Sequence, residues 1–146
     1  MTQMVQVGEK PEVMRTAVAE GWLQLQAHTL DAIREGTVKK GSPFEVAKVA
    51  AIQAVKETPR ILPLCHPIPI TGVEVDLKLD GDSVYASVEA SACYKTGVEM
   101  EALTAVAAAL LTVWDMTKYL EKDSDGQYPE TRIENIRVVE KHKGSV

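Results

Sequence analysis

Asp115 and Lys118 form the pair whose types and spacing are best suited to proton transfer. They stand three residues apart at the end of a mostly apolar stretch, so on a helix their side chains share one face. Desolvation in such a place shifts pKa values and suits a carboxyl and an ammonium group to acid–base catalysis. An ordinary surface ion pair is the alternative interpretation.

His66 lies between prolines, next to Pro67, in a segment whose backbone is largely fixed and cannot be helical. A rigidly held imidazole can serve as an acid, a base or a phosphate donor, or it can be a satisfied structural histidine, and the residues alone favour neither. Its neighbour Cys65 should point to the opposite face, so a Cys–His nucleophile pair is not expected. Cys65 and Cys93 are both predicted to be buried thiols.

Lys39 and Lys40 precede Gly41 and Ser42, where a helix is predicted to begin. Two ammonium groups beside the free amides of a helix N-terminus are a plausible seat for a phosphate. A solvated basic turn has the same composition and is the commoner arrangement, so these residues alone favour the turn.

Glu99 and Glu101 stand at the start of a long apolar segment. Glu99 follows Thr96 by three residues, the spacing of a capping box, which would close the start of a helix. Glu101 directly precedes apolar residues, and a carboxyl in that position needs a partner or a ligand.

Glu101 and Asp115 are fourteen residues apart, which places them on nearly the same helix face but about 21 Å apart along the axis. One small site in a single chain cannot easily use both. We therefore expect a site completed across a subunit interface, or a long substrate such as a nucleoside triphosphate. A fully active monomer would contradict the interface version.

The elements that must position these residues follow from hydrophobic periodicity and turn signals. We predict a strand over 13–25 with a bulge or bend at Gly21, a helix over 28–35 that stops at Gly36, a helix from the capping residue Ser42 to about Glu57, ending near Thr58-Pro59, hairpin strands over 73–79 and 84–92, a helix over 96–120 and a last strand over 133–139. Residues 1–11 and 141–146 are candidates for disorder. This order predicts an α+β, ferredoxin-like split β-α-β sandwich whose antiparallel sheet is covered by helices on one face.

The helix predicted over 96–120 is apolar nearly all the way round, so it needs cover on two sides. One side can be the sheet of its own chain. In a domain this small, a second subunit is the simplest cover for the other side, and Ala105 and Ala107 to Ala109 would allow its close approach.

Length and charge narrow the function classes. A chain of 146 residues with a net charge of −5 is expected to be one domain over 1–146, with no general affinity for nucleic acid or for an anionic membrane. Two cysteines and no apolar leader fit a reducing cytoplasm. The most apolar stretch, 102–113, is too short for a membrane span and is predicted to be a buried helix.

Four segments together resemble the cyclic pyranopterin monophosphate synthase family of molybdenum cofactor biosynthesis: Lys40-Gly41, the segment 61–67 (ILPLCHP), the segment 95–105 (KTGVEMEALTA) and the segment 115–118 (DMTK). The resemblance implies an enzyme that converts 3',8-cyclo-7,8-dihydroguanosine triphosphate to cyclic pyranopterin monophosphate and releases pyrophosphate. It further implies a homohexamer, a trimer of dimers, with each site at a dimer interface.

The family's site residues fall on matching positions of this sequence. The resemblance makes Asp115 and Lys118 the catalytic pair, and the candidate substrate-binding residues are Leu64, Cys65, His66, Met100, Glu101, Glu99, Lys40, Arg15 and Lys141. Two departures stand out: Gln6 replaces an aspartate of the family pattern, and the tail after Lys141 is shortened. Mg²⁺ on the substrate triphosphate is plausible, but no metal-ligand cluster in the sequence demands it.

Two other function classes remain as alternatives. A regulatory module on the same scaffold would bind a small ligand without releasing pyrophosphate, because fold alone does not fix function. An RNA-binding ferredoxin-like domain is disfavoured, because the strands lack paired exposed aromatic residues and the net charge is negative.

Overall fold

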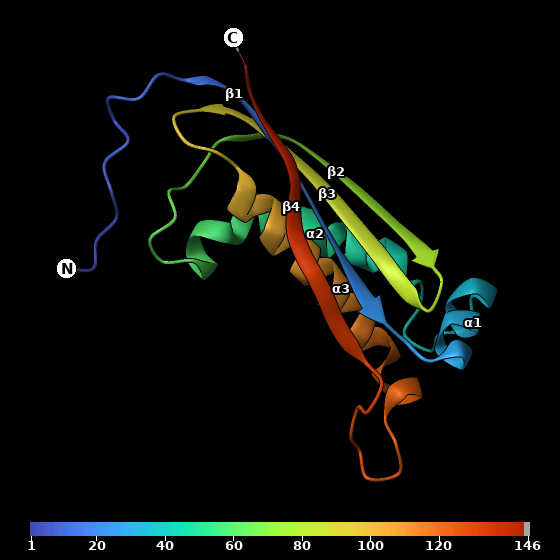
Figure 1. Ribbon diagram of the computed structural model, residues 1–146. Coiled ribbons are helices and arrows are strands. Elements are labelled where there is room, and N and C mark those ends of the chain that lie inside the picture. The colour runs from blue at the N-terminus through green and yellow to red at the C-terminus, as the bar shows by residue number, and fades with distance from the viewer. Residues whose placement is uncertain (145–146) are drawn as a thin grey trace.

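The computed structural model describes residues 1–144, which form one sheet and three helices (Figure 1). In chain order the elements are β1 (Val13–Gln24), α1 (Ala27–Glu35), α2 (Pro43–Ile61), β2 (Ile70–Asp80), β3 (Ser83–Tyr94), α3 (Glu99–Glu121) and β4 (Arg132–Gly144). The predicted elements are all present, although several of their ends differ from the prediction.

The four strands form one antiparallel sheet in the order β2-β3-β1-β4. Because β3 lies between β1 and β2, the connection through α1 and α2 is a split β-α-β unit. The α+β, ferredoxin-like prediction is therefore confirmed. The alternation that predicted the hairpin also sets its register, in which Val75 pairs with Val88 and their side chains face the helices.

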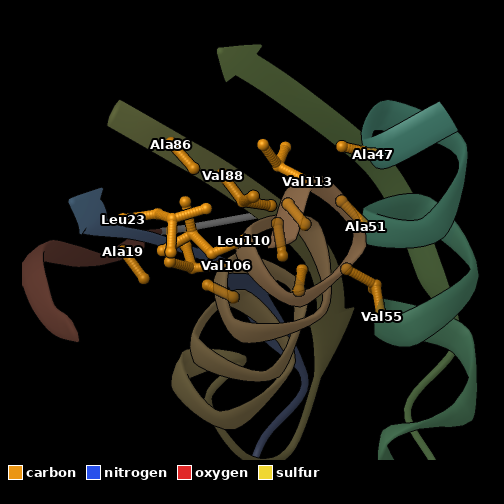
Figure 2. Close-up of a cluster of buried hydrophobic side chains, with 14 of the residues drawn as sticks. Ala19, Leu23, Ala47, Ala51, Val55, Ala86, Val88, Val106, Leu110 and Val113 are labelled. Carbon is orange, nitrogen blue, oxygen red and sulfur yellow. The ribbon is translucent and has the colours of Figure 1, made fainter. Parts of the chain in front are cut away.

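The core lies between the sheet and the two long helices, α2 and α3. Figure 2 shows Val106 and Leu110 of α3 against Leu23 of β1, with Ala51 and other residues of α2 on the next side of the same helix. The second cover of α3 is thus α2 of the same chain, where we expected a second subunit. Small alanines permit this close helix contact, since Ala51, Ala105 and Ala109 are fully buried.

By length and composition alone, α3 is apolar enough to cross a membrane. Half of the relevant stretch is buried inside the protein, and the helix packs on both β1 and α2. Its apolar character is that of a core helix, as the sequence predicted for 102–113.

Gly21 of β1 packs closely against α3 and β4. A methyl group there would lie 2.9 Å from side-chain carbons of both Ile136 and Val106, so only glycine fits without movement. The pairing of β1 with β4 is irregular at this point, because the register jumps between Glu20 and Trp22. The bulge predicted at Gly21 is confirmed, and β4 supplies the extra residue, with Asn135 in the left-handed conformation.

Both ends of α2 differ from the prediction. Ser42 is the N-cap and Pro43 the first helical residue, as expected, but the Ser42 side chain makes no capping hydrogen bond. The helix does not end at Thr58-Pro59; it continues to Ile61 with Pro59 inside it. Proline removes one amide donor, but this loss is tolerated in a last turn that the amide of Leu62 closes on the carbonyl of Thr58.

The ends of two later elements were also predicted wrongly. α3 begins at Glu99, three residues after the predicted start, and its N-cap is Val98 without a side-chain bond, so Thr96 and Glu99 form no capping box. β4 extends to Gly144 and includes Lys141, which we expected in a disordered tail. It extends because β1 offers partners along its whole length, with Met14 pairing Gly144.

Candidate active site

A pocket of about 480 Å³ lies at the N-terminal end of α3. One wall is the segment 62–66, which follows α2, and the other is the turn between β3 and α3 with Thr96, Gly97, Glu99 and Met100. Leu64, Cys65, His66, Glu99 and Met100 were all predicted site residues, and the fold brings them around one space. The prolines on either side of His66 keep this segment non-helical, so that it can form a wall.

Glu101 is buried behind this pocket, with only 1% of its surface exposed. Its Oε2 lies 3.8 Å from Sγ of Cys65, a weak contact in which the thiol donates. Its Oε1 is buried and has no hydrogen-bond partner. Burial raises the pKa of the Glu101 carboxyl, and the nearby charge of Glu99 adds to this shift. We expected Glu101 to need a partner or a ligand. Its Oε2 has a partner in Cys65, whereas its Oε1 has none.

Cys65 is half-buried, as is Cys93, and neither forms a disulfide within the described chain. The prediction of fully buried thiols is therefore only partly right. Burial raises the pKa of the Cys65 thiol, and the charge of Glu101 raises it further. A thiol with a raised pKa is a poor nucleophile, which agrees with the expectation that Cys65 and His66 are not a nucleophile pair.

Arg15 is the second site residue with an unsatisfied group. It lies in β1, is 8% exposed, and donates from Nε to the carbonyl oxygen of Tyr94 at 3.3 Å. Its Nη2 is buried without a partner. Within residues 1–144, only Arg15 Nη2 and Glu101 Oε1 are buried side-chain atoms of this kind. Such groups are costly unless a ligand or water pairs with them, so both atoms mark a place where a ligand can supply hydrogen bonds.

Lys141 reaches the same end of α3 from β4. Its Nζ lies 3.6 Å from Oε1 of Glu99, and its side chain is 66% exposed. Lys141 pairs with Ala17 of β1, a fully buried residue that faces the helices, which explains why the lysine points to the helix side of the sheet. The pocket therefore has an exposed cation at its edge.

The C-terminal half of α3 carries a separate ionic cluster. Asp115 lies 3.2 Å from Nζ of Lys118 through Oδ1 and 3.2 Å from Nζ of Lys40 through Oδ2. Lys40 comes from the turn before α2, so the predicted pair becomes a triad. Hydrogen bonds from Lys40 and then Lys118 lower the pKa of the Asp115 carboxyl.

Within one chain this triad is not desolvated, contrary to the prediction. The side chain of Asp115 is 58% exposed and that of Lys118 is 44% exposed. The buried apolar residues that precede Asp115 face α2 and the sheet, whereas Asp115 itself lies with exposed Leu111 on the outer stripe of α3. In the single chain, the geometry is that of the alternative interpretation, a surface ion pair.

The predicted site residues thus gather into two groups at opposite ends of α3. Glu101 and Asp115 mark these groups, and at 1.5 Å per residue they are about 21 Å apart along the helix axis. The sequence analysis singled out Gln6 of the N-terminal segment, but it missed the contacts that this segment makes beside the first group. There, His66 contacts the carbonyl of Val5 and Lys95 contacts the carbonyl of Gly8. Backbone contacts over such separations leave no signal in the residue pattern.

Comparison with known proteins identifies the family of this chain. The family model described as MoaC family matches residues 4–144. Three relatives, each called a probable cyclic pyranopterin monophosphate synthase, cover 97% of this chain: those of Thermococcus kodakarensis (56% identical, 91% of its length), Methanosarcina acetivorans (58%, 90%) and Pyrococcus abyssi (54%, 89%). The chain therefore belongs to the MoaC family.

Proposed function

We propose that this protein is a lyase that converts 3',8-cyclo-7,8-dihydroguanosine triphosphate to cyclic pyranopterin monophosphate and pyrophosphate in molybdenum cofactor biosynthesis. Its relatives over nearly the whole length carry the synthase name. The structural observation that carries the proposal is that two different groups of side chains lie at opposite ends of α3. One end has a largely apolar pocket, with two residues that carry a buried unsatisfied polar atom behind it, and the other has an exposed triad of one carboxylate and two ammonium groups.

The two parts of the proposed reaction, ring rearrangement and pyrophosphate release, require different side chains. Rearranging the purine-derived ring to a pterin requires repeated proton transfers, which suit Asp115 and Lys118. Forming the cyclic phosphate expels pyrophosphate, whose charge must be stabilised by cations. Lys40, Lys141 and His66 would supply hydrogen-bond donors to phosphate oxygens, and the ring system would meet Arg15 and Glu101.

We further propose that a working site combines the pocket of one chain with the triad of a second chain. The outer stripe of α3 carries exposed Met100 and Leu111, with Ala107 and Ala108 between them. A two-fold axis beside Ala108 that pairs α3 with its copy in antiparallel fashion would place Asp115 of each chain near Glu101 of the other, because 108 is midway between them.

Such a dimer would also remove the triad from water. Leu111 is 55% exposed and stands one helical turn before Asp115, so a copy that covers Leu111 also covers the carboxylate. Desolvation raises a carboxyl pKa, which opposes the lowering by Lys40 and Lys118 and favours proton transfer near neutral pH. A trimer of such dimers and a cytoplasmic location complete the proposal.

Mg²⁺ would be bound by the phosphates of the substrate rather than by a protein site. Within the described residues no group of three His, Cys, Asp or Glu side chains is placed to hold a metal ion. The cations Lys40 and Lys141 would then share the phosphate charge with the metal. Addition of EDTA to the assay tests this requirement.

Replacement of Asp115 by asparagine tests the catalytic assignment. Asp115→Asn is expected to lower turnover of the cyclised nucleotide by about 10²–10⁴-fold, measured as pyrophosphate release and as pterin fluorescence after oxidation. Asp31→Asn is the matched control, because Asp31 is equally exposed and pairs with Arg34 at the same spacing. Wild-type turnover in Asp115→Asn would contradict the assignment.

Mixing two impaired variants tests the composite site. Asp115→Asn and Glu101→Gln chains, unfolded and refolded together, should recover about a quarter of wild-type activity, since half of the dimers are mixed and each has one intact site. Recovery near zero would place both residues in the same chain's site.

A further inference from the structure

We propose that the N-terminal segment 1–10 is a strap that positions the His66 imidazole, with Lys95 as the residue that anchors the strap. This inference rests on the proposed role of His66 in substrate binding. It adds two parts to the site: a backbone carbonyl of the strap and a lysine outside the predicted set. Lys95 acts through His66 and is therefore a positioning residue.

Two hydrogen bonds connect the strap to opposite walls of the pocket. Nε2 of His66 lies 2.8 Å from the carbonyl oxygen of Val5, and Nζ of Lys95 donates to the carbonyl oxygen of Gly8 at 3.0 Å. His66 belongs to the wall 62–66, and Lys95 directly precedes the other wall. In Figure 1 the blue N-terminal segment runs beside the green connection between α2 and β2. The strap therefore bridges the two segments that form the pocket.

The contact with Val5 decides which ring nitrogen of His66 is available. A carbonyl oxygen can only accept a hydrogen bond, so Nε2 must carry the hydrogen and donate it to Val5. Nδ1 then has no partner from the strap. It is an acceptor in the neutral ring, and in the protonated ring it carries a hydrogen that it can donate to a phosphate oxygen while Nε2 still donates to Val5. Pro67 restricts the backbone of His66 while the Val5 carbonyl orients its ring, so the imidazole is held from both ends.

Little else holds the strap in place, which is why its anchor matters. Residues 1–6 and 8–10 are exposed, and ordering exposed chain costs backbone entropy. The amide of Lys10 closes a turn on the carbonyl of Val7, and this turn contains Gly8. Lys95 donates a hydrogen bond to that turn. Replacing Lys95 should therefore release the strap and break the contact between Val5 and His66.

Lys95→Met tests the anchor, and Lys95→Arg, which can still donate to Gly8, tests its rescue. In the full-length protein, ¹⁵N relaxation should show residues 4–9 ordered in wild type and in Lys95→Arg but mobile in Lys95→Met. KM for the cyclised nucleotide should rise about tenfold in Lys95→Met, with kcat within about twofold, because a binding group is misplaced while Asp115 is not. An ordered segment in Lys95→Met would overturn the proposal.

A double-mutant cycle separates positioning from direct substrate contact. In a His66→Ala background the strap has nothing to orient, so Lys95→Met should cause no further rise in KM. Additive effects would overturn the proposal, because they would mean that Lys95 meets the substrate itself. The double variant Val5→Gly, Gln6→Gly loosens the strap without touching Lys95 and should behave like Lys95→Met, whereas Thr2→Gly, Gln3→Gly, outside the two contacts, should behave like wild type.

This outcome is distinct from failure of the proposed function. If the wild-type protein released no pyrophosphate, the proposed function would fail while the relaxation data still reported on the strap. If the enzyme is active and the two substitutions add, the strap fails and the proposed function stands.

Discussion

The two ends of α3 each bury a glutamate, and the two residues have opposite surroundings. Glu121 is fully buried and accepts hydrogen bonds from the amide of Gln26 and from the hydroxyl groups of Thr29 and Thr131. Glu101 is equally buried, yet it has one weak contact to Cys65 and one unpaired oxygen. The same residue type, on the same helix and at the same depth, is satisfied by its own chain at one end only.

Burial of a carboxyl group therefore does not by itself mark a functional site. The partners of Glu121 join the end of α3 to the start of α1 and to the loop before β4, which is a structural clamp. Glu101 has no such clamp and lies behind a pocket, so its missing partner is expected to come with a ligand. The comparison predicts that one residue supports stability and the other supports activity.

The largest expected effect is on the clamp. Glu121→Ala leaves the buried hydroxyls of Thr29 and Thr131 and the amide of Gln26 without their acceptor, at a cost of about 3 kcal/mol in the free energy of unfolding. Urea denaturation measures this loss. The kcat/KM of the folded fraction should stay within about twofold of wild type. A loss of activity without a loss of stability would contradict the assignment of Glu121 to the scaffold.

The second prediction concerns Glu101, whose replacement should lower activity and not stability. Glu101→Gln should lower kcat/KM about thirtyfold, or about 2 kcal/mol, because the substrate loses a buried carboxyl partner. The free energy of unfolding should not fall at neutral pH, since the chain gives Oε1 no partner to lose. Steady-state kinetics and urea denaturation on the same preparation measure both quantities. A variant that unfolds more easily but turns over normally would assign Glu101 to the scaffold.

The smallest effect is a pH dependence. The pKa of Glu101 is raised by burial, so the native state holds its proton more tightly than the unfolded state does. Between the unfolded and the folded pKa, the native state binds more protons, and this residue's contribution to stability therefore falls as pH rises. Glu101→Gln should remove that fall, measured by urea denaturation from pH 4 upward. An unchanged pH profile would contradict the raised pKa.

Local features of the fold were predictable, because their causes lie close together in the sequence. Alternation around Gly81 predicted the hairpin, and Gly36 in the left-handed conformation ends α1 as expected. The end of β4 was not predictable, since Lys141 lies in a strand only because β1 provides distant partners. Pro59 misled for the opposite reason: a local rule was overridden in the last turn of α2.

The site residues were likewise predictable where they lie close together in the sequence and not where they are far apart. The spacing of Asp115 and Lys118 predicted their ion pair, and the apolar context of Glu101 predicted its need for a partner. The addition of Lys40 to the triad joins residues that are 75 positions apart, and the contacts of Glu121 with Thr29 join residues that are 92 positions apart. Such contacts are set by packing, which no single segment encodes.

Because Lys141 lies in a strand, the positive charge at the edge of the pocket depends on the number of residues that precede Lys141 in β4. Lys141 pairs with Ala17 and faces Glu99, whereas Glu140 pairs with Val18 on the opposite face of the sheet. One residue inserted between them would move Lys141 opposite Thr16 and turn its ammonium group away from the pocket. A flexible tail would absorb such an insertion, but a paired strand converts it into the loss of a cation.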